Sequence, residues 1–433
     1  MNPTALRVMA QLCCTAILWC SLTTTLAQER ATPEFRYQEQ WQALTDADDH
    51  AAAADLAKTW VNDTKRQFGD GAAETFLPLT FLADSYAASD QNQLAIITYQ
   101  DAIEVGEIEI GVFARALLDP LVKLSELLKA NDQHNEAVTA LVRAKDITHR
   151  VEGIYNTEQT GIIEKLSDVY LLLNDVRQAT REQKLLLSSE SREVGYDSPA
   201  LVPALHRWAD FNVKINRRRD ARRFLHDAVE ILEKAYGPDD IRIAETLKLI
   251  AETFRSDQSS VRPREGLKAL RRVVDIYQAQ DNVDQADLLK AKSSLGDWYL
   301  TTGRRSRGLE TYENAVIAAR EAGLSDAAIN KLYAKPEPLT TTDQPEGSNR
   351  IGLQRKSEFW SSVMIDKLDG SIIFEFDVNE RGFPKNIRVV EDTIGRARMV
   401  NMLRTWVAAV VYRPKFENGE AVVTYGLRRE FEF

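Results

Sequence analysis

The chain has 433 residues, and its 55 Lys or Arg against 65 Asp or Glu give a net charge of −10, which disfavours nucleic-acid binding. The length exceeds one ordinary hydrophobic core, so we expect several domains or one extended array. All three cysteines, Cys13, Cys14 and Cys20, lie near the start, which excludes disulfides and cysteine-ligated metal sites from the rest of the chain.

The N-terminus has the pattern of a secretory signal. Arg7 precedes residues 8–27, which carry no charge and end in the small-residue site Thr25-Leu26-Ala27. We expect residues 1–27 to be a cleaved signal peptide and the remainder to be periplasmic, because an exported chain without disulfides fits a Gram-negative periplasm. The alternative is an uncleaved anchor, in which residues 8–27 hold the protein at the inner membrane.

A 42-residue period runs through the middle of the chain. Each unit has a large residue, a small one, a further large or aromatic one, then small, large and small again. The first unit shows it as Leu82, Ala83, Tyr86, Ala95, Tyr99 and Ala102. Five more units follow, with exceptions such as Gln183 and Asn212 and a three-residue insertion near 259–262. Spacings of three and four predict two antiparallel helices per unit.

This pattern resembles the tetratricopeptide repeat (TPR), in the 42-residue variety of kinesin light chain. The resemblance covers about residues 70–325, and residues 35–68 look like a degenerate capping pair of helices. It implies a helical-repeat superhelix over residues 35–330.

In this family the residue after the first small position points into the groove of the superhelix. Here that residue is acidic in all six units. The resemblance therefore makes these carboxylates a candidate partner-binding groove for a basic or polar segment: Asp84, Glu126, Asp168, Asp210, Glu252 and Asp297. The alternative is that they satisfy local hydrogen bonds or pair with basic residues of the next helix.

A linker over residues 331–350 precedes a C-terminal domain at 351–433. Residues 372–378 alternate as a strand with Phe374, Phe376 and Val378 on one face, and 386–391 form the second strand. Met399, Leu403, Trp406 and Val410 recur at helical spacing, and Tyr412-Arg413-Pro414 ends that helix. Asn418-Gly419 is a turn signal before a closing strand at 420–433.

The order strand, strand, helix, strand, together with Gly370, Gly382 and the elements just described, resembles the C-terminal domain of TonB. The fold class is thus mainly α: a helical-repeat superhelix followed by a small α+β (ββαβ) TonB-like domain. In the TonB family this domain accepts an extended segment of an outer-membrane receptor by adding it to the sheet.

Catalysis has little support in the sequence. The five histidines form no metal-ligand spacing, and phosphate-binding loops and nucleophile motifs are missing. We therefore expect no enzyme activity, no cofactor and no metal. Two basic clusters, Arg217–Arg219 with Arg222 and Arg223, and Arg304, Arg305 and Arg307, fit solvated turns or, alternatively, an anionic contact.

The sequence predicts a periplasmic protein-interaction scaffold, accessory to TonB-type outer-membrane transport. The alternative is a structural adaptor for envelope assembly without an energy-transducing role. Expected partners are proteins, such as a receptor segment and motor or envelope proteins, and not nucleic acid. Residues 28–111 carry a net charge of −11, so we expect the N-terminal repeats to be the strongly negative end.

Overall fold

The computed structural model describes residues 33–153, 156, 159–255, 263–339, 370–417 and 419–432. The expected signal peptide and its cysteines lie outside the described residues. The chain divides into two compact units, Met1–Leu173 and Asn174–Phe433.

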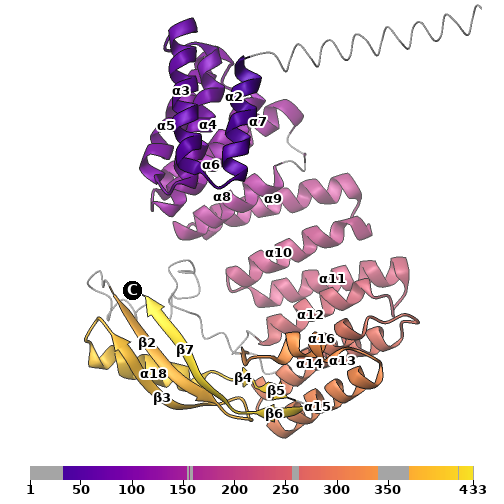
Figure 1. The fold of residues 1–433 in the computed structure, drawn as a ribbon. Coiled ribbons are helices and arrows are strands. Elements are labelled where there is room, and N and C mark those ends of the chain that lie inside the picture. The colour runs from indigo at the N-terminus through magenta and orange to yellow at the C-terminus, as the bar shows by residue number, and fades with distance from the viewer. Residues whose placement is uncertain are drawn as a thin grey trace, which may run out of the picture. The chain divides into compact units, whose positions relative to one another are not determined.

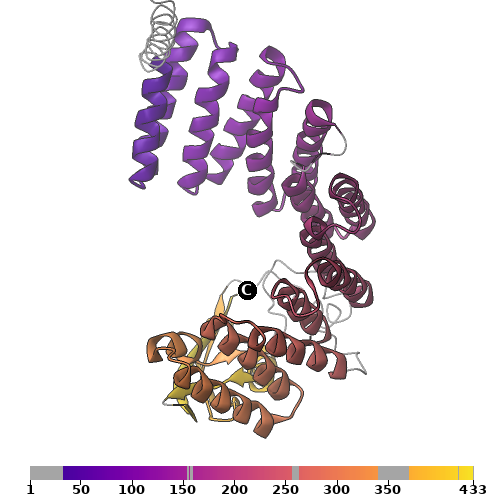
Figure 2. The same cartoon turned by 90° about the vertical axis from the view of Figure 1, so that its right-hand side faces the viewer.

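The first unit is a row of antiparallel helices (Figures 1 and 2). Its core contains Tyr99, Leu121 and Leu141, each at most 1% exposed. The single-turn 3-10 helices η1 (Ala73–Thr75) and η2 (Arg115–Leu117) precede two of the longer ones. The helices are α2 (Pro33–Asp46), α3 (His50–Phe68), α4 (Phe76–Ala88), α5 (Asn92–Glu109), α6 (Leu118–Ala130), α7 (His134–Glu152) and α8 (Thr160–Leu172).

The second unit continues the helix pairs and adds the C-terminal strands. Its helical core holds Leu225, Ile243 and Val273, all at most 1% exposed. The 3-10 turn η3 (Pro199–Leu201) leads into α10. The helices are α9 (Val176–Val194), α10 (Val202–Lys214), α11 (Arg218–Tyr236), α12 (Arg242–Arg255), α13 (Pro263–Gln278), α14 (Gln285–Thr301), α15 (Arg305–Glu321) and α16 (Asp326–Tyr333).

The backbone of the turns repeats with the same 42-residue period as the side chains. Inside the pairs, a residue with positive φ, between 57° and 63°, ends the first helix at Asp48, Asp90, Asp132, Asn174 and Asn216. Asp and Asn tolerate this left-handed conformation better than other non-glycine residues. Between pairs, the turn uses glycine with φ between 88° and 115°, at Gly69, Gly111, Gly153, Gly195 and Gly237.

The small positions of the period lie where helices cross closely. Ala83, Ala95 and Ala137 are fully buried. At Gly296, an added Cβ would overlap the ring of Tyr312. The exception Asn212 is also buried, and its side-chain amide donates to the Trp208 carbonyl at 2.7 Å. Periodic turns and periodic close crossings together confirm a TPR-like helical-repeat fold.

The C-terminal domain is a three-stranded antiparallel sheet with one helix on it (Figure 1). The strand order is β3-β2-β7, and α18 (Ala397–Ala409) lies on the apolar face. Phe374, Phe376 and Val378 point into this core, as the alternation predicts. The strands of the sheet are β2 (Ser371–Val378), β3 (Pro384–Asp392) and β7 (Thr424–Glu432).

The expected closing strand at 420–433 is wrong in its first part. Residues Glu420–Val422 form β6, which pairs with β5 (Lys415–Glu417) and not with the sheet. The reason is packing, because Phe416 on this hairpin is 3% exposed and joins the core of the last repeat helices beside Tyr312 and Tyr333. Only β7 closes the sheet.

The expected linker at 331–350 is wrong for residues 331–339. Tyr333 ends α16 fully buried, and β1 (Glu337–Pro338) pairs with β4 (Tyr412–Arg413). Leu339 is 5% exposed, and its N–H donates to the Val411 carbonyl at 2.8 Å. This stretch joins the last helices to the C-terminal domain by packing and backbone pairing.

Candidate functional site

The six predicted acids lie on the first helices of successive pairs, α4, α6, α8, α10, α12 and α14. Four of them, Glu126, Asp168, Asp210 and Glu252, are exposed. Asp84 is half-buried and Asp297 is buried. We call the set of six the acid line.

Basic side chains lie beside several members of the acid line. Lys123 on α6 reaches Asp84 on the preceding first helix with Nζ–Oδ1 at 2.9 Å, and Lys165 on α8 reaches Glu126 in the same way, each pair 39 residues apart. Farther along the chain the cations come from the same helix, where Lys214 lies 3.4 Å from Asp210 and Arg255 lies 2.5 Å from Glu252. At Asp84 and Glu126 the cation thus comes from the following repeat, whereas Asp210 and Glu252 pair with a cation of their own helix.

Asp297 has the most complete set of partners. The Tyr312 hydroxyl donates to its Oδ1 at 2.6 Å. Arg413 donates from Nε to Oδ1 at 2.8 Å and from Nη2 to Oδ2 at 2.6 Å. Burial and the Asp297 charge raise the pKa of Tyr312 well above its ordinary range. Burial alone would lower the pKa of Arg413, but the hydrogen bonds to Asp297 outweigh it and raise that pKa.

The prediction that Asp297 stays accessible is therefore wrong. It is 6% exposed because Arg413 of the C-terminal domain covers it. The same arrangement occurs at Asp84, which accepts from Tyr99 fifteen residues later and pairs with Lys123 of the next repeat. Arg413 thus takes the place of the cation that a following repeat would supply. The shared tyrosine was readable in the sequence, whereas Arg413 was interpreted there only as part of a helix stop.

The sheet offers a second candidate surface. Among the described strands, β7 pairs only with β2, so its other edge has no strand beside it. On the sheet face opposite α18, Glu375 of β2 accepts from Arg388 of β3 and from Arg428 of β7, the latter at 3.2 Å. The hydrogen bond from Arg388 is the main cause that lowers the pKa of Glu375. These cross-strand pairs hold the three strands in register beside the open edge.

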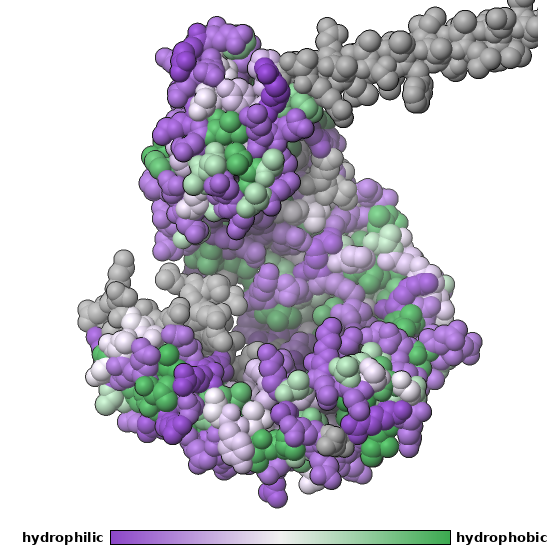
Figure 3. Space-filling model, viewed as in Figure 1, coloured by the Kyte–Doolittle hydropathy of each residue, from purple (hydrophilic) through white to green (hydrophobic). Residues whose placement is uncertain are grey.

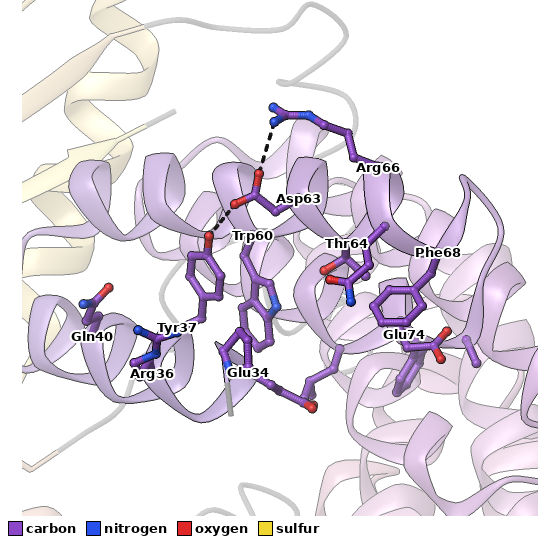
Figure 4. A pocket seen from close by; sticks show the side chains of 15 residues that line it. Glu34, Arg36, Tyr37, Gln40, Trp60, Asp63, Thr64, Arg66, Phe68 and Glu74 are labelled. Carbon is purple, nitrogen blue, oxygen red and sulfur yellow. Dashed lines mark hydrogen bonds and ion pairs between the residues drawn. The ribbon is translucent and has the colours of Figure 1, made fainter. Parts of the chain in front are cut away.

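A hollow of about 860 Å³ lies at the start of the first unit, between α2, α3 and the beginning of α4 (Figure 4). Tyr37 stacks on Trp60 with ring centroids 5.3 Å apart and donates its hydroxyl hydrogen to Asp63 at 2.7 Å. Arg66 pairs with the other oxygen of Asp63 at 3.4 Å. No sequence motif pointed to this hollow.

The histidines are not brought together for chemistry. His206 lies 2.8 Å from the Thr246 hydroxyl of the next pair, and burial lowers its pKa. Among the described residues, no three His, Asp or Glu side chains form a group that could hold a metal ion. Within the same residues, no helix combines the length and apolar character needed to cross a membrane. The surface drawn in Figure 3 is largely hydrophilic, with small separate hydrophobic patches.

No protein-family model and no curated protein matches the chain. Several solved helical-repeat structures are similar to it. A putative kinesin light chain with nearly identical TPR-like repeats from Podosopora anserina is 16% identical over 46% of this chain and 95% of that chain, with a TM-score of 0.41. The apo form of RapI is 14% identical over 72% and 93%, with a TM-score of 0.44. YrrB, described as a TPR protein with an unusual peptide-binding site, is 14% identical over 52% and 95%, with a TM-score of 0.30.

Proposed function

We propose that this protein is a periplasmic protein-interaction scaffold, accessory to TonB-type outer-membrane transport. The observation that carries the scaffold role is the acid line, of which Glu126, Asp168, Asp210 and Glu252 are exposed on successive first helices. Within each of the two units, exposed carboxylates at one repeat position offer acceptors for Lys, Arg or backbone N–H groups of a bound segment.

A basic partner would compete with the cations already beside the line. Lys165, Lys214 and Arg255 are each about a third to a half exposed, so their pairs with the acids are weak surface ion pairs. Such pairs exchange for a partner's cations at little cost. Asp297 takes no part in this binding, since Arg413 already occupies both of its oxygens.

The acid line is tested with a lysine-rich peptide and the double variant Asp168→Asn/Asp210→Asn. Glu310→Gln/Glu313→Gln is the matched control, because it removes two exposed acids from the second helix α15. Fluorescence anisotropy should show weaker binding for the first variant only, and binding should weaken as salt screens the charges. Equal binding by all three proteins would refute the groove.

The transport role rests on the open edge of β7 and on the resemblance to TonB. An extended receptor segment can add to such an edge through backbone hydrogen bonds. Tyr425 on β7 is 75% exposed, and the chain has no cysteine beyond residue 20. In exported protein carrying Tyr425→Cys, a receptor segment scanned with single cysteines should form disulfides at every second position. Disulfide formation without this alternation would contradict strand addition.

A structural adaptor for envelope assembly is the second candidate. The bidentate Arg413–Asp297 pair favours it, because it fixes the C-terminal domain to the last repeat helices rather than leaving it on a free tether. Deleting the gene tests the choice. Loss of energy-dependent uptake with an intact envelope supports the transport role, whereas envelope defects with normal uptake support the adaptor.

The periplasmic location is also a proposal, since residues 1–27 lie outside the described residues. Its support is the signal pattern ending at Ala27. N-terminal sequencing of exported protein should find Gln28 first. Finding Met1 retained in the membrane fraction would favour the inner-membrane anchor instead.

A further inference from the structure

A second hollow, of about 360 Å³, lies between α13, the end of α14 and the turn before α15. Four cations line it: Arg264, Lys268, Arg271 and Arg304. None of the described residues that line it is acidic. We call it the α13–α15 pocket.

No acidic side chain among the described residues pairs with any of the four pocket cations. Arg264, Lys268 and Arg304 are exposed, and none of them forms an ion pair or side-chain hydrogen bond with a described residue. Arg271 donates to the Tyr299 hydroxyl at 3.0 Å, which orients its guanidinium while other N–H groups stay available. Arg272, next to it on α13 but outside the pocket, is instead paired with Glu233 at 2.6 Å.

Three of the cations repeat along one face of α13. Arg264, Lys268 and Arg271 are spaced four and three residues apart, so they are neighbours on the helix surface. Like charges at this spacing destabilise a helix unless an anion lies between them. No acid among the residues described in the structure lies in the pocket to offset these charges.

Trp298 and the start of α15 complete the pocket. Its floor is Trp298, which is 3% exposed and packs on Gly266, where any side chain would overlap the ring. Arg304 is the N-cap residue of α15, a helix of 17 residues. The free N–H groups and positive dipole end of such a helix start attract negative charge.

We propose that the α13–α15 pocket binds a phosphate group, carried by a lipid headgroup or by a free phosphate compound. Guanidinium groups match phosphate oxygens in paired hydrogen bonds, and four cations around one hollow suit a group with several charged oxygens. An acidic peptide, whose carboxylates are spread along a chain, would need a longer row of cations. The four cations come from α13 and the turn before α15, whereas the acid line lies on the first helices and the open edge belongs to β7.

The test uses the full exported chain and two variants with equal changes in charge. Lys268→Gln/Arg304→Gln removes two pocket cations that form no ion pair with any residue in the described part of the chain. Arg217→Gln/Arg219→Gln removes two exposed cations at the start of α11, in the same unit. Pyrophosphate binding is measured by calorimetry at low salt, and vesicle binding by co-sedimentation with phosphatidylcholine alone or mixed with phosphatidylglycerol. A glutamate-rich peptide is the third ligand.

We expect the pocket variant to lose about tenfold or more in affinity while the control variant binds as the parent does. If pyrophosphate binding follows this pattern, the ligand of the pocket is a free phosphate compound. If the protein binds only to vesicles that contain phosphatidylglycerol, the ligand is a lipid headgroup. Equal losses in both variants, no binding of either phosphate probe, or binding of the glutamate-rich peptide alone would each overturn the proposal. Thermal unfolding at the same midpoint in all three proteins shows that the substitutions leave the fold intact.

Discussion

Arg413 donates two hydrogen bonds to Asp297, which lies 116 residues earlier in the chain. Both side chains are about nine-tenths buried. The pair shows that the C-terminal domain ends the row of helix pairs by supplying the cation that the next repeat would have supplied. The same contact decides that Asp297, alone among the six predicted acids, is closed to a partner.

Breaking this pair should be costly. Arg413→Met leaves the Asp297 charge buried without its partner, and we expect a loss of about 3 kcal/mol in the free energy of unfolding. Lys290→Gln is the control, because it breaks an exposed pair with Asp287 and should change stability by at most about 0.5 kcal/mol. Urea unfolding measures both. Similar small effects for the two variants would show that the buried pair is not needed for docking.

Gly382 makes a second close contact, this one inside the C-terminal domain. Its φ is +78°, its carbonyl accepts from the Tyr412 N–H at 2.9 Å, and an added Cβ would overlap the Tyr412 carbonyl oxygen. Gly426 has φ +68° with open space around it. Gly382→Ala should therefore destabilise the protein by at least about 2 kcal/mol more than Gly426→Ala. If thermal unfolding shows nearly equal stability for the two variants, the close approach of Gly382 to the Tyr412 carbonyl oxygen is contradicted.

Stability should fall at alkaline pH because of buried tyrosines. Burial raises the pKa of Tyr333 to about 12, and burial together with the charge of Asp297 also raises the pKa of Tyr312. A raised pKa means that the folded state favours the neutral phenol, so this contribution is complete below about pH 10 and is lost as pH rises through the folded pKa. Tyr312→Phe should lessen the loss of unfolding free energy between about pH 8 and pH 11. Tyr425→Phe, at an exposed site, should leave it unchanged.

The glycines of the repeat turns should be hard to replace. Gly195 has φ 90° and ψ 148°, a conformation that only glycine adopts readily, so Gly195→Ala should cost about 1–3 kcal/mol. Gly161 lies inside α8 in open space, and Gly161→Ala should stabilise by up to about 1 kcal/mol through a less flexible unfolded chain. If Gly195 has this turn conformation, chemical unfolding should show that the free energy of unfolding falls for Gly195→Ala and rises for Gly161→Ala.

Much of the fold was predictable because its signals are local. Small residues at close helix crossings, large ones between helices and turn glycines recur every 42 residues, and each acts within one unit or on its neighbour. The strand at 371–378 was predictable for the same reason, because Phe374, Phe376 and Val378 alternate with outward residues. The helical spacing of three and four residues and the alternation along a strand both depend only on how a helix or a strand presents its side chains.

The sequence by itself determined where the six acids lie along the repeats, but only the tertiary structure decided which of them are accessible. The six acids occupy the same position in each repeat, but this cannot show that Asp297 is buried. Asp297 is buried by Arg413, which belongs to the C-terminal domain. The split of the closing strand has the same origin, since Phe416 is drawn to Tyr312 and Tyr333 by burial of apolar surface. The α13–α15 pocket likewise joins Arg304 to cations more than thirty residues earlier, a proximity that no sequence spacing encodes.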